Sequence, residues 1–132
     1  MIAFDTNVLL RLLLNDDARQ SKQAQAVVDR AISASDRVLL PDIVLCELEW
    51  VLDSVYKLPK SKIMETLRRL LDAEEFAFIN RVAVAQALES YRKGKADFSD
   101  YLIGESSAVA GATTTYTFDR ALRRTSGFSH PV

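Results

Sequence analysis

The first ten residues, MIAFDTNVLL (residues 1–10), place an acidic residue where one apolar segment meets the next. The segment MIAF is short, apolar and uncharged, which predicts a strand buried on both faces of a sheet. The VLLRLLL segment that follows is rich in leucine and predicts a helix, with Thr6 or Asn7 as its cap. Asp5 thus lies at the junction of a strand and a helix, where a carboxylate can form a turn or serve a binding site.

Downstream of this start, strand-like and helix-like segments alternate. Strands are predicted at RVLLP (37–41), FAFI (76–79) and ATTTYTF (112–118), with an edge strand in GFSHPV (127–132). Between them, helices are predicted at residues 18–33, at 43–56 after an Asp42 cap, at 61–73, at 81–93 between Asn80 and Gly94, in the segment before Gly111, and in RALRRT (120–125). This alternation favours a parallel sheet in an α/β sandwich.

Composition limits the classes of protein that fit. The chain has 132 residues, of which 48% are hydrophobic and 27% charged, which predicts a single globular domain spanning residues 1–132. Its net charge of −1 excludes binding of nucleic acid by overall charge, so such a role needs a local site. One cysteine, no signal peptide and no run long enough to span a membrane predict a cytoplasmic protein.

Acidic residues recur at positions where elements meet. Asp5 and Asp119 each follow a predicted strand, so both belong to the carboxyl edge of the sheet, where open parallel sheets bind ligands. Asp97 and Asp100 are three residues apart, as an N-cap and the third residue of a helix. Capping and the helix dipole explain either of these aspartates taken singly, so only the set points to chemistry.

Glu47 is the most informative of the acids. Its helical neighbours three and four residues away are all apolar, namely Ile43, Val44, Trp50 and Val51. A carboxylate buried on such a face needs an ion-pair partner, a route to water or a functional reason, because its desolvation is costly. Glu49, with Asp53 four residues on, is expected at the surface.

Carboxylates gathered at one end of a sheet repel one another, and a cation offsets this repulsion. Oxygen ligands of this kind suit Mg²⁺ or Mn²⁺. Zinc is disfavoured because the only His and Cys are His130, expected at the surface near the chain end, and Cys46, expected in the core.

Four segments in this order resemble a PIN domain, and more narrowly the toxin ribonuclease of VapBC toxin–antitoxin modules. They are MIAFDTNVLL, VLCELEWVL, DFSDYLIGESSA and TFDRAL, and the resemblance covers essentially the whole chain. It implies a three-layer α/β sandwich in which a central, mostly parallel sheet of four to five strands is flanked by helices. The implied activity is a Mg²⁺-dependent endoribonuclease, with Mn²⁺ as a substitute ion.

The resemblance assigns roles position by position. Asp5, Glu47, Asp100 and Asp119 match the acids that bind metal and catalyse hydrolysis, and Asp97 matches an additional acid of some members. Asn7, with Thr6 beside it, matches a position that supports the first acid. The segment GESSA departs from the family, which has small alanines there.

The resemblance also implies partners. These are an RNA substrate, a VapB-like antitoxin that places a basic side chain in the acidic pocket, and a second copy of the chain in a homodimer. Candidate RNA contacts are the basic residues beside the acids, Arg92, Lys93 and Lys95 before Asp97 and Arg120 after Asp119. Leucines of residues 8–14 and 61–72 are candidate partner surfaces, although core packing is the simpler explanation for most of them.

Two other readings remain open at this stage. A phosphoaspartyl domain of the phosphatase type needs a second Asp two residues after the first, but position 7 is Asn. A receiver domain needs paired acids after its first strand, and these are also missing. A PIN-like module that binds RNA or a protein without cutting is the main alternative, although all four acids are present.

Overall fold

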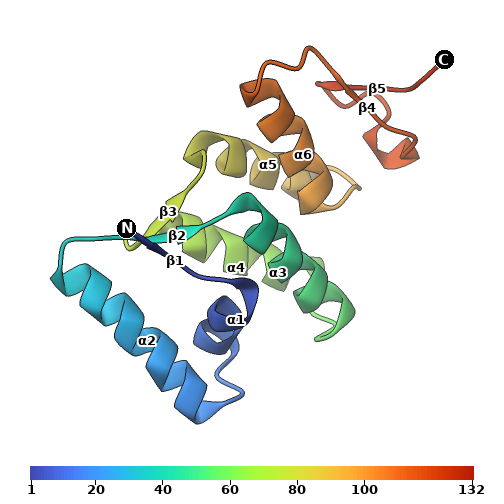
Figure 1. Ribbon diagram of the computed structural model, residues 1–132. Coiled ribbons are helices and arrows are strands. Elements are labelled where there is room, and N and C mark those ends of the chain that lie inside the picture. The colour runs from blue at the N-terminus through green and yellow to red at the C-terminus, as the bar shows by residue number, and fades with distance from the viewer. The chain divides into compact units, whose positions relative to one another are not determined.

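The computed structural model describes residues 1–132, which form two compact units, unit 1 (Met1–Ile79) and unit 2 (Asn80–Val132) (Figure 1). Unit 1 contains β1 (Ile2–Ala3), α1 (Thr6–Leu14), α2 (Ala18–Ser33), β2 (Val38–Leu40), α3 (Asp42–Ser54), α4 (Lys60–Asp72) and β3 (Phe76–Phe78). Unit 2 contains α5 (Arg81–Lys93), α6 (Phe98–Val109), β4 (Thr115–Tyr116), the short 3₁₀ helix η1 (Arg120–Leu122) and β5 (Phe128–Ser129).

The strands of unit 1 form a parallel sheet in the order β1-β2-β3. Leu39 of the central strand pairs with Ala3 on one side and with Ala77 on the other. Its neighbours Val38 and Leu40 are fully buried, as expected for the middle strand of a covered parallel sheet. The predicted α/β class is therefore confirmed.

Strand β1 lies at the edge of this sheet, which corrects the prediction that residues 1–4 are buried on both faces. Ile2 is 40% exposed and Ala3 is also exposed, whereas Phe4, just after the strand, is buried. An apolar strand sequence cannot distinguish an edge from a centre, because strand order depends on pairing between distant segments.

The helices of unit 1 bury one apolar stripe each. Helix α4 buries Ile63, Leu67, Leu70 and Leu71, which confirms the predicted helical spacing. Helix α2 spans the predicted residues, and α1 buries Leu9 and Leu10 against its neighbours. Most of the leucines considered as partner surfaces in α4 therefore belong to the core.

Unit 2 is built around the helix pair α5 and α6, which lie side by side in Figure 1. Asn80 caps α5 by accepting a hydrogen bond from the Ala83 N–H at 2.9 Å, and Gly94 ends it, as predicted. At the joint between the helices, the rings of Tyr91 and Phe98 meet edge to face, with centroids 6.3 Å apart.

The last two strands form a separate parallel pair, with Thr115 opposite Phe128 and Tyr116 opposite Ser129. Five strands are thus present, but they form a three-stranded sheet and a two-stranded sheet rather than one sheet of four to five. Phe128 packs over α6 at Gly104, where an added β-carbon would lie 2.7 Å from the phenylalanine ring. The glycine in the unusual GESSA segment therefore has a packing role.

None of the helices combines the length and the apolar character that crossing a lipid bilayer requires.

Candidate active site

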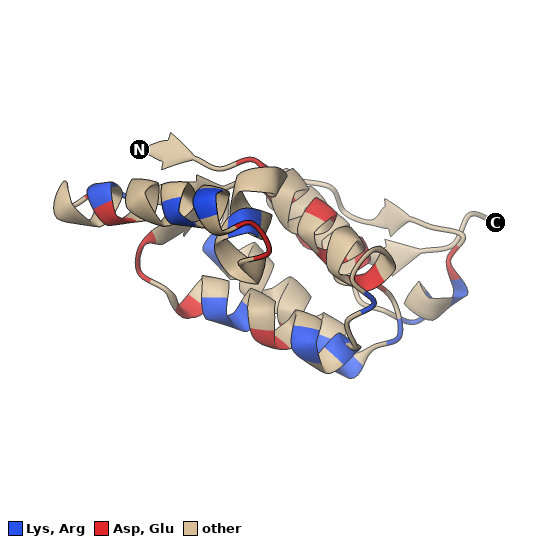
Figure 2. Ribbon diagram, turned by 90° about the horizontal axis from the view of Figure 1, so that it is seen from below, with Lys and Arg blue, Asp and Glu red and all other residues tan.

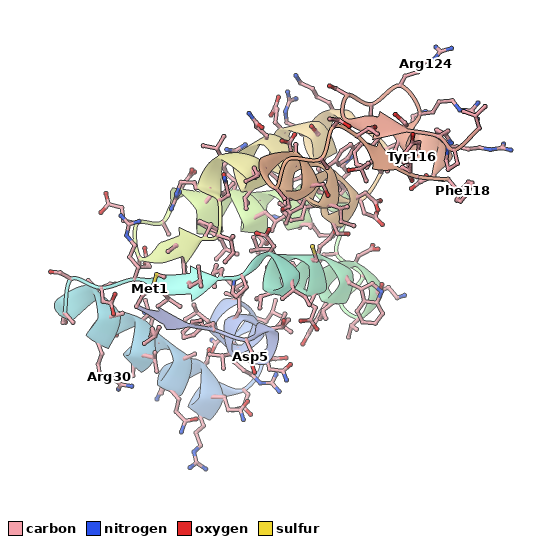
Figure 3. The ribbon with its side chains drawn as sticks, turned by 45° about the horizontal axis from the view of Figure 1, so that its top comes forward. Met1, Asp5, Arg30, Tyr116, Phe118 and Arg124 are labelled. Carbon is pink, nitrogen blue, oxygen red and sulfur yellow. The ribbon has the colours of Figure 1, made fainter.

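Asp5 follows β1 directly and begins α1. Its Oδ1 accepts a hydrogen bond from the Val8 N–H at 3.0 Å, so Asp5, and not Thr6 or Asn7 as predicted, is the N-cap. No protein donor contacts its second carboxylate oxygen, and the side chain is exposed at the start of the helix (Figure 3). The fold thus fixes this carboxylate through one oxygen and leaves the other available.

Glu47 reaches the same helix end from the middle of α3. The Thr6 hydroxyl donates a hydrogen bond to Glu47 Oε1 at 3.0 Å, across 41 positions of sequence. Since Thr6 directly follows Asp5, this bond brings the two predicted acids of unit 1 to the first turn of α1, beyond the carboxyl end of β1. Thr6 was predicted to support the site, and its contact in the structure is with Glu47, to which its hydroxyl donates.

The orientation of α3 corrects the expectation for its two glutamates. Glu47 is exposed, between the exposed side chains of Ile43 and Trp50, whereas Glu49 is 5% exposed. The buried stripe of α3 consists of Val44, Leu45, Leu48, Glu49 and Leu52. Apolar residues surround this helix on nearly all sides, so the sequence does not reveal which face enters the core. The helix also begins at Asp42 itself, after a Pro41 N-cap, so Asp42 is not the cap that was predicted.

A cleft of about 330 Å³ opens beside Asp5 between α1 and α2. Its walls include Asn7 and Arg11 from α1 and Gln20 and Gln23 from α2. Asn7 was predicted to support Asp5. It makes no hydrogen bond to Asp5, and the two residues only line the same cleft. Val8, Ala24 and Val27 complete the walls, so the cleft gives Asp5 an open approach within unit 1 whose lining is mostly apolar.

The acids of unit 2 form a second set. Asp97 is the N-cap of α6 and Asp100 is the third residue of the helix, as their spacing predicts. Asp100 Oδ2 accepts a hydrogen bond from the Asp97 N–H at 3.1 Å. Burial, and then the negative charges of Asp97 and Asp119, raise the pKa of Asp100 above its ordinary value, although that hydrogen bond opposes them.

Asp119 lies in the connection between β4 and η1 and is held at both sides. Its Oδ1 accepts a hydrogen bond from the Ala121 N–H at 2.9 Å, and its own N–H donates to the Thr117 hydroxyl oxygen at 3.0 Å. The predicted capping role of Asp119 is therefore confirmed, for a helix of only three residues. Its charge acts on Asp100, so the structure places these two acids of unit 2 near each other.

All five predicted acids supply oxygen donors, the donor type that Mg²⁺ and Mn²⁺ prefer. Within either unit, no three side chains of His, Cys, Asp or Glu are arranged to hold a metal ion. The donor chemistry fits a hard divalent cation. His130, expected at the surface, is instead half-buried, and no cluster of nitrogen or sulfur donors exists.

The predicted basic contacts divide into two kinds. Arg92 and Lys93 both bind Glu89, through guanidinium and ammonium contacts to Oε1 at 2.6 and 3.4 Å. The Arg92 hydrogen bonds lower the pKa of Glu89 to about 2. Lys95 and Arg120 are exposed and form no salt bridge, so only these two of the four retain an uncommitted charge.

Comparison with known proteins gives two matches. The PIN domain family matches residues 2–127. A VapC ribonuclease of Aquifex aeolicus (strain VF5) is 23% identical over 124 residues, which cover 94% of this chain and 91% of that protein. PIN domains are in general nucleases that depend on divalent metal ions. The match to the family spans nearly the whole sequence, and the chain belongs to the PIN domain family.

Proposed function

We propose that this protein is a Mg²⁺-dependent endoribonuclease that acts as the toxin of a type II toxin–antitoxin module. Membership of the PIN family and the VapC ribonuclease relative support a PIN nuclease in general. The metal, the toxin role and the individual site residues are proposals, as is the extent of the domain, residues 1–132.

The observation that carries the proposal is the hydrogen bond from Thr6 to Glu47. The stability of an apolar helix does not require a glutamate in its middle to lie near the carboxyl end of β1, where Asp5 is also found. Parallel sheets bind ligands at this end of their strands. The bond therefore gathers two carboxylates where a substrate site is expected.

In the proposed site, Asp5 and Asp100 are the main metal ligands, and Glu47 and Asp119 bind a second ion or orient the attacking water. A bound divalent ion would polarise the scissile phosphate and stabilise charge on the leaving oxygen. Thr6 holds Glu47 in one orientation, and the Thr117 hydroxyl and the Ala121 N–H hold Asp119. Asp97 lies at the margin and contributes charge.

The resemblance to the VapC toxins implies that an attacking water displaces the 3′-oxygen of the preceding nucleotide in line, leaving a 5′-phosphate and a 3′-hydroxyl. The attacking water gives up a proton to a carboxylate of the set, and the leaving 3′-oxygen takes up a proton from solvent water. The same resemblance supports two further proposals, a VapB-like antitoxin that inserts a basic side chain among the acids and a homodimer of this chain.

The test is cleavage of a pool of transfer RNA, ribosomal RNA and single-stranded RNA, with Mg²⁺, with EDTA and with Asp5→Asn protein. Asp17→Asn is the matched control, because Asp17 caps α2 as Asp5 caps α1, accepting from the Gln20 N–H at 3.0 Å. Asparagine also caps helices, so both variants keep their helix start. Cutting that EDTA and Asp5→Asn abolish, and Asp17→Asn retains, supports the proposal.

Two results would count against it. Cutting that survives both EDTA and Asp5→Asn would contradict the metal mechanism. Absence of cutting by folded protein freed of antitoxin would favour a PIN module that binds RNA or a protein without hydrolysis. Mapping the ends of any product then identifies the substrate and checks the 5′-phosphate.

A further inference from the structure

A polar network lies at the end of α1, away from the acids at its start. The Arg11 guanidinium donates from Nε to Gln20 Oε1 at 2.6 Å and from Nη1 to Asp16 Oδ1 at 3.0 Å. The Tyr56 hydroxyl donates to the other oxygen of Asp16, Oδ2, at 2.8 Å. The Ser21 hydroxyl donates to the Arg11 carbonyl at 2.6 Å. The network joins α1, the start of α2 and the end of α3, and all its members belong to unit 1.

Local helix stabilisation explains only part of this network. Arg11 and Asp16 are five positions apart, so their ion pair is a local contact at the end of α1. Tyr56 lies 40 positions from Asp16, just beyond α3, and no local motif accounts for their bond. Asp16 is not the cap of α2 either, because Asp17 has that role. In Figure 2 these two acids colour the connection between α1 and α2, at the start of α2.

The charges of the network keep the long-range contact formed at neutral pH. The Tyr56 hydrogen bond lowers the pKa of Asp16, and Arg11 acts in the same direction, although desolvation opposes them. The bond to Asp16 in turn raises the pKa of the Tyr56 phenol. The carboxylate therefore stays an acceptor and the phenol a donor over a wide range of pH. Because surface pairs of this kind add little to stability, the consequence of the network for geometry is the more informative one.

Helices α1 and α3 are joined by hydrogen bonds at two separated places. Thr6 bonds Glu47 near the start of α1, and Asp16 bonds Tyr56 beyond its end. At the helical rise per residue, the two places are about 12 Å apart along each helix, and they follow in the same order, so the helices run in the same direction. Apolar contacts are not directional, whereas two hydrogen bonds far apart fix both the position and the rotation of one helix on the other.

The same network ties together the two walls of the cleft beside Asp5. Arg11 of α1 and Gln20 of α2 both line this cleft, and they are bonded to each other. Asp5 lines it about one and a half turns earlier along α1. A shift of α1 after loss of the network would therefore move the carboxylate of Asp5 relative to Glu47, which belongs to α3.

We propose that Arg11, Asp16 and Tyr56 form a clamp that holds α1 on α3 and thereby positions Asp5 relative to Glu47. This inference rests on the proposed nuclease function and adds positioning residues to it. The clamp residues act through α1, whose first turn carries both Asp5 and the donor to Glu47. Groups that serve one reaction must hold their geometry to within about 0.5 Å, so a small rotation of α1 is sufficient to slow catalysis.

The first test removes only the hydroxyl of the clamp. Tyr56→Phe keeps the ring and is expected to lower kcat for RNA cleavage by about 2- to 30-fold, with KM little changed. Tyr56→4-aminophenylalanine should restore the rate, because its amino group donates from the same position. Asp16→Ala, which loses both bonds of the carboxylate, should lower kcat at least as much as Tyr56→Phe.

A double-mutant cycle tests whether the clamp acts through α1. In a Thr6→Val chain, Glu47 has already lost its donor, so Tyr56→Phe should cost little further cleavage. In a Thr66→Val chain, which loses a hydroxyl bonded within α4, Tyr56→Phe should have its full effect. Substitutions more than about 10 Å apart ordinarily have additive effects, so coupling between Tyr56 and Thr6 requires a connection such as α1.

Unfolding in urea gives a test that does not depend on cleavage. The clamp predicts that the changes in free energy of unfolding from Tyr56→Phe and Thr6→Val are not additive, whereas those from Tyr56→Phe and Thr66→Val are. A purely local contribution of Tyr56 to stability would be additive in both cycles. If the protein cuts no RNA at all, the proposed nuclease fails, and this coupling still decides for or against the clamp.

Three results would overturn the clamp. The first is unchanged cleavage by Tyr56→Phe in a protein that Asp5→Asn inactivates. The second is additivity of Tyr56→Phe and Thr6→Val in both cleavage and unfolding. The third is a loss of cleavage in Tyr56→Phe that 4-aminophenylalanine does not restore, because the effect would then have a cause other than the hydrogen bond to Asp16.

Discussion

The acidic side chains of the two units differ in their burial and in the charges around them. In unit 1, Asp5 and Glu47 each accept a hydrogen bond from the first turn of α1, from the Val8 N–H and the Thr6 hydroxyl. In unit 2, burial and then the charges of Asp97 and Asp119 raise the pKa of Asp100. Unit 1 holds its exposed carboxylates by hydrogen bonds alone, whereas unit 2 combines hydrogen bonds to Asp100 and Asp119 with burial and like charge at Asp100.

This difference indicates which acidic residues the stability of the fold explains without any catalytic role. A capping aspartate stabilises its helix, so Asp5 would be present in many folds without any chemistry. Burial and like charge make the ionised form of Asp100 costly, so the set in unit 2 is a second sign of function beside the bond from Thr6 to Glu47. The predictions below test this contrast between a bonded set and a repelling set.

The largest effect is expected from Asp100→Asn. Loss of this proposed metal ligand should reduce RNA cleavage by more than about 100-fold, since even partners of metal ligands commonly account for about 10- to 100-fold. Asparagine can still accept the Asp97 N–H, so the helix start should remain. Cleavage kinetics and circular dichroism measure the two consequences. Cleavage within a few-fold of the original would remove Asp100 from the proposed ligand set.

A smaller loss is expected from Thr6→Val, which deletes the donor to Glu47. As a positioning residue, Thr6 should contribute about 10-fold or somewhat more to cleavage, and Thr6→Ser should restore the rate. Thr66→Val is the control, since Thr66 donates to the Lys62 carbonyl at 2.8 Å within α4. If Thr6→Ser and Thr6→Val behave alike, orientation of Glu47 by the hydroxyl is not the reason.

Gly104→Val probes how unit 2 positions its strand pair. The new side chain would overlap the Phe128 ring, and the overpacking should lower the free energy of unfolding by about 1–3 kcal/mol. Phe128→Leu in the same chain should recover part of this loss, while Ala108→Val on an exposed part of α6 should have little effect. Denaturation by urea measures all three, and an unaltered midpoint for Gly104→Val would exclude the tight packing.

The smallest effect concerns pH. Because the folded protein raises the pKa of Asp100, it binds that proton more tightly than the unfolded chain does. Stability from this group should fall as pH rises from the unfolded pKa through the raised value, and stay lower above it. Asp100→Asn should remove this fall in urea titrations that begin at about pH 4, near the ordinary pKa of aspartate, and continue upward.

Glu89→Gln should change the pH dependence of stability in the opposite direction to Asp100→Asn, within the same unit. The pKa of Glu89 is lowered to about 2, so its contribution to stability is present above the ordinary value and lost as pH falls toward 2. If both variants change the pH profile in the same direction, the contrast between repelling and paired acids is wrong.

Sequence reasoning predicted the elements well where local signals were strong. The bounds of α2 and α5 follow from helix-forming residues between clear start and stop positions, and Asp97 with Asp100 follows from a spacing of three. The order of four motifs sufficed to identify the PIN resemblance, because that pattern depends on residue types and not on packing.

Features that depend on distant pairing were not predictable. The hydrogen bond between Thr6 and Glu47 joins residues 41 positions apart, and no local sequence pattern predicts it. The exposure of Glu47 and the burial of Glu49 depend on which face of an almost wholly apolar α3 meets its neighbours. The pairing of Arg92 and Lys93 with Glu89, by contrast, follows from spacings of three and four residues along α5, which a sequence shows.

Asp5 caps α1 and is also a proposed metal ligand, and this combination has a genetic consequence. Aspartate and asparagine codons differ by a single transition, and asparagine keeps the cap that begins α1. Under selection against the proposed toxic activity, we expect Asp5→Asn among the surviving alleles, encoding a folded and abundant protein rather than a degraded one. On the proposed toxin function, the protein made from such an allele would still occupy the antitoxin and would therefore release an active copy of the toxin in the same cell.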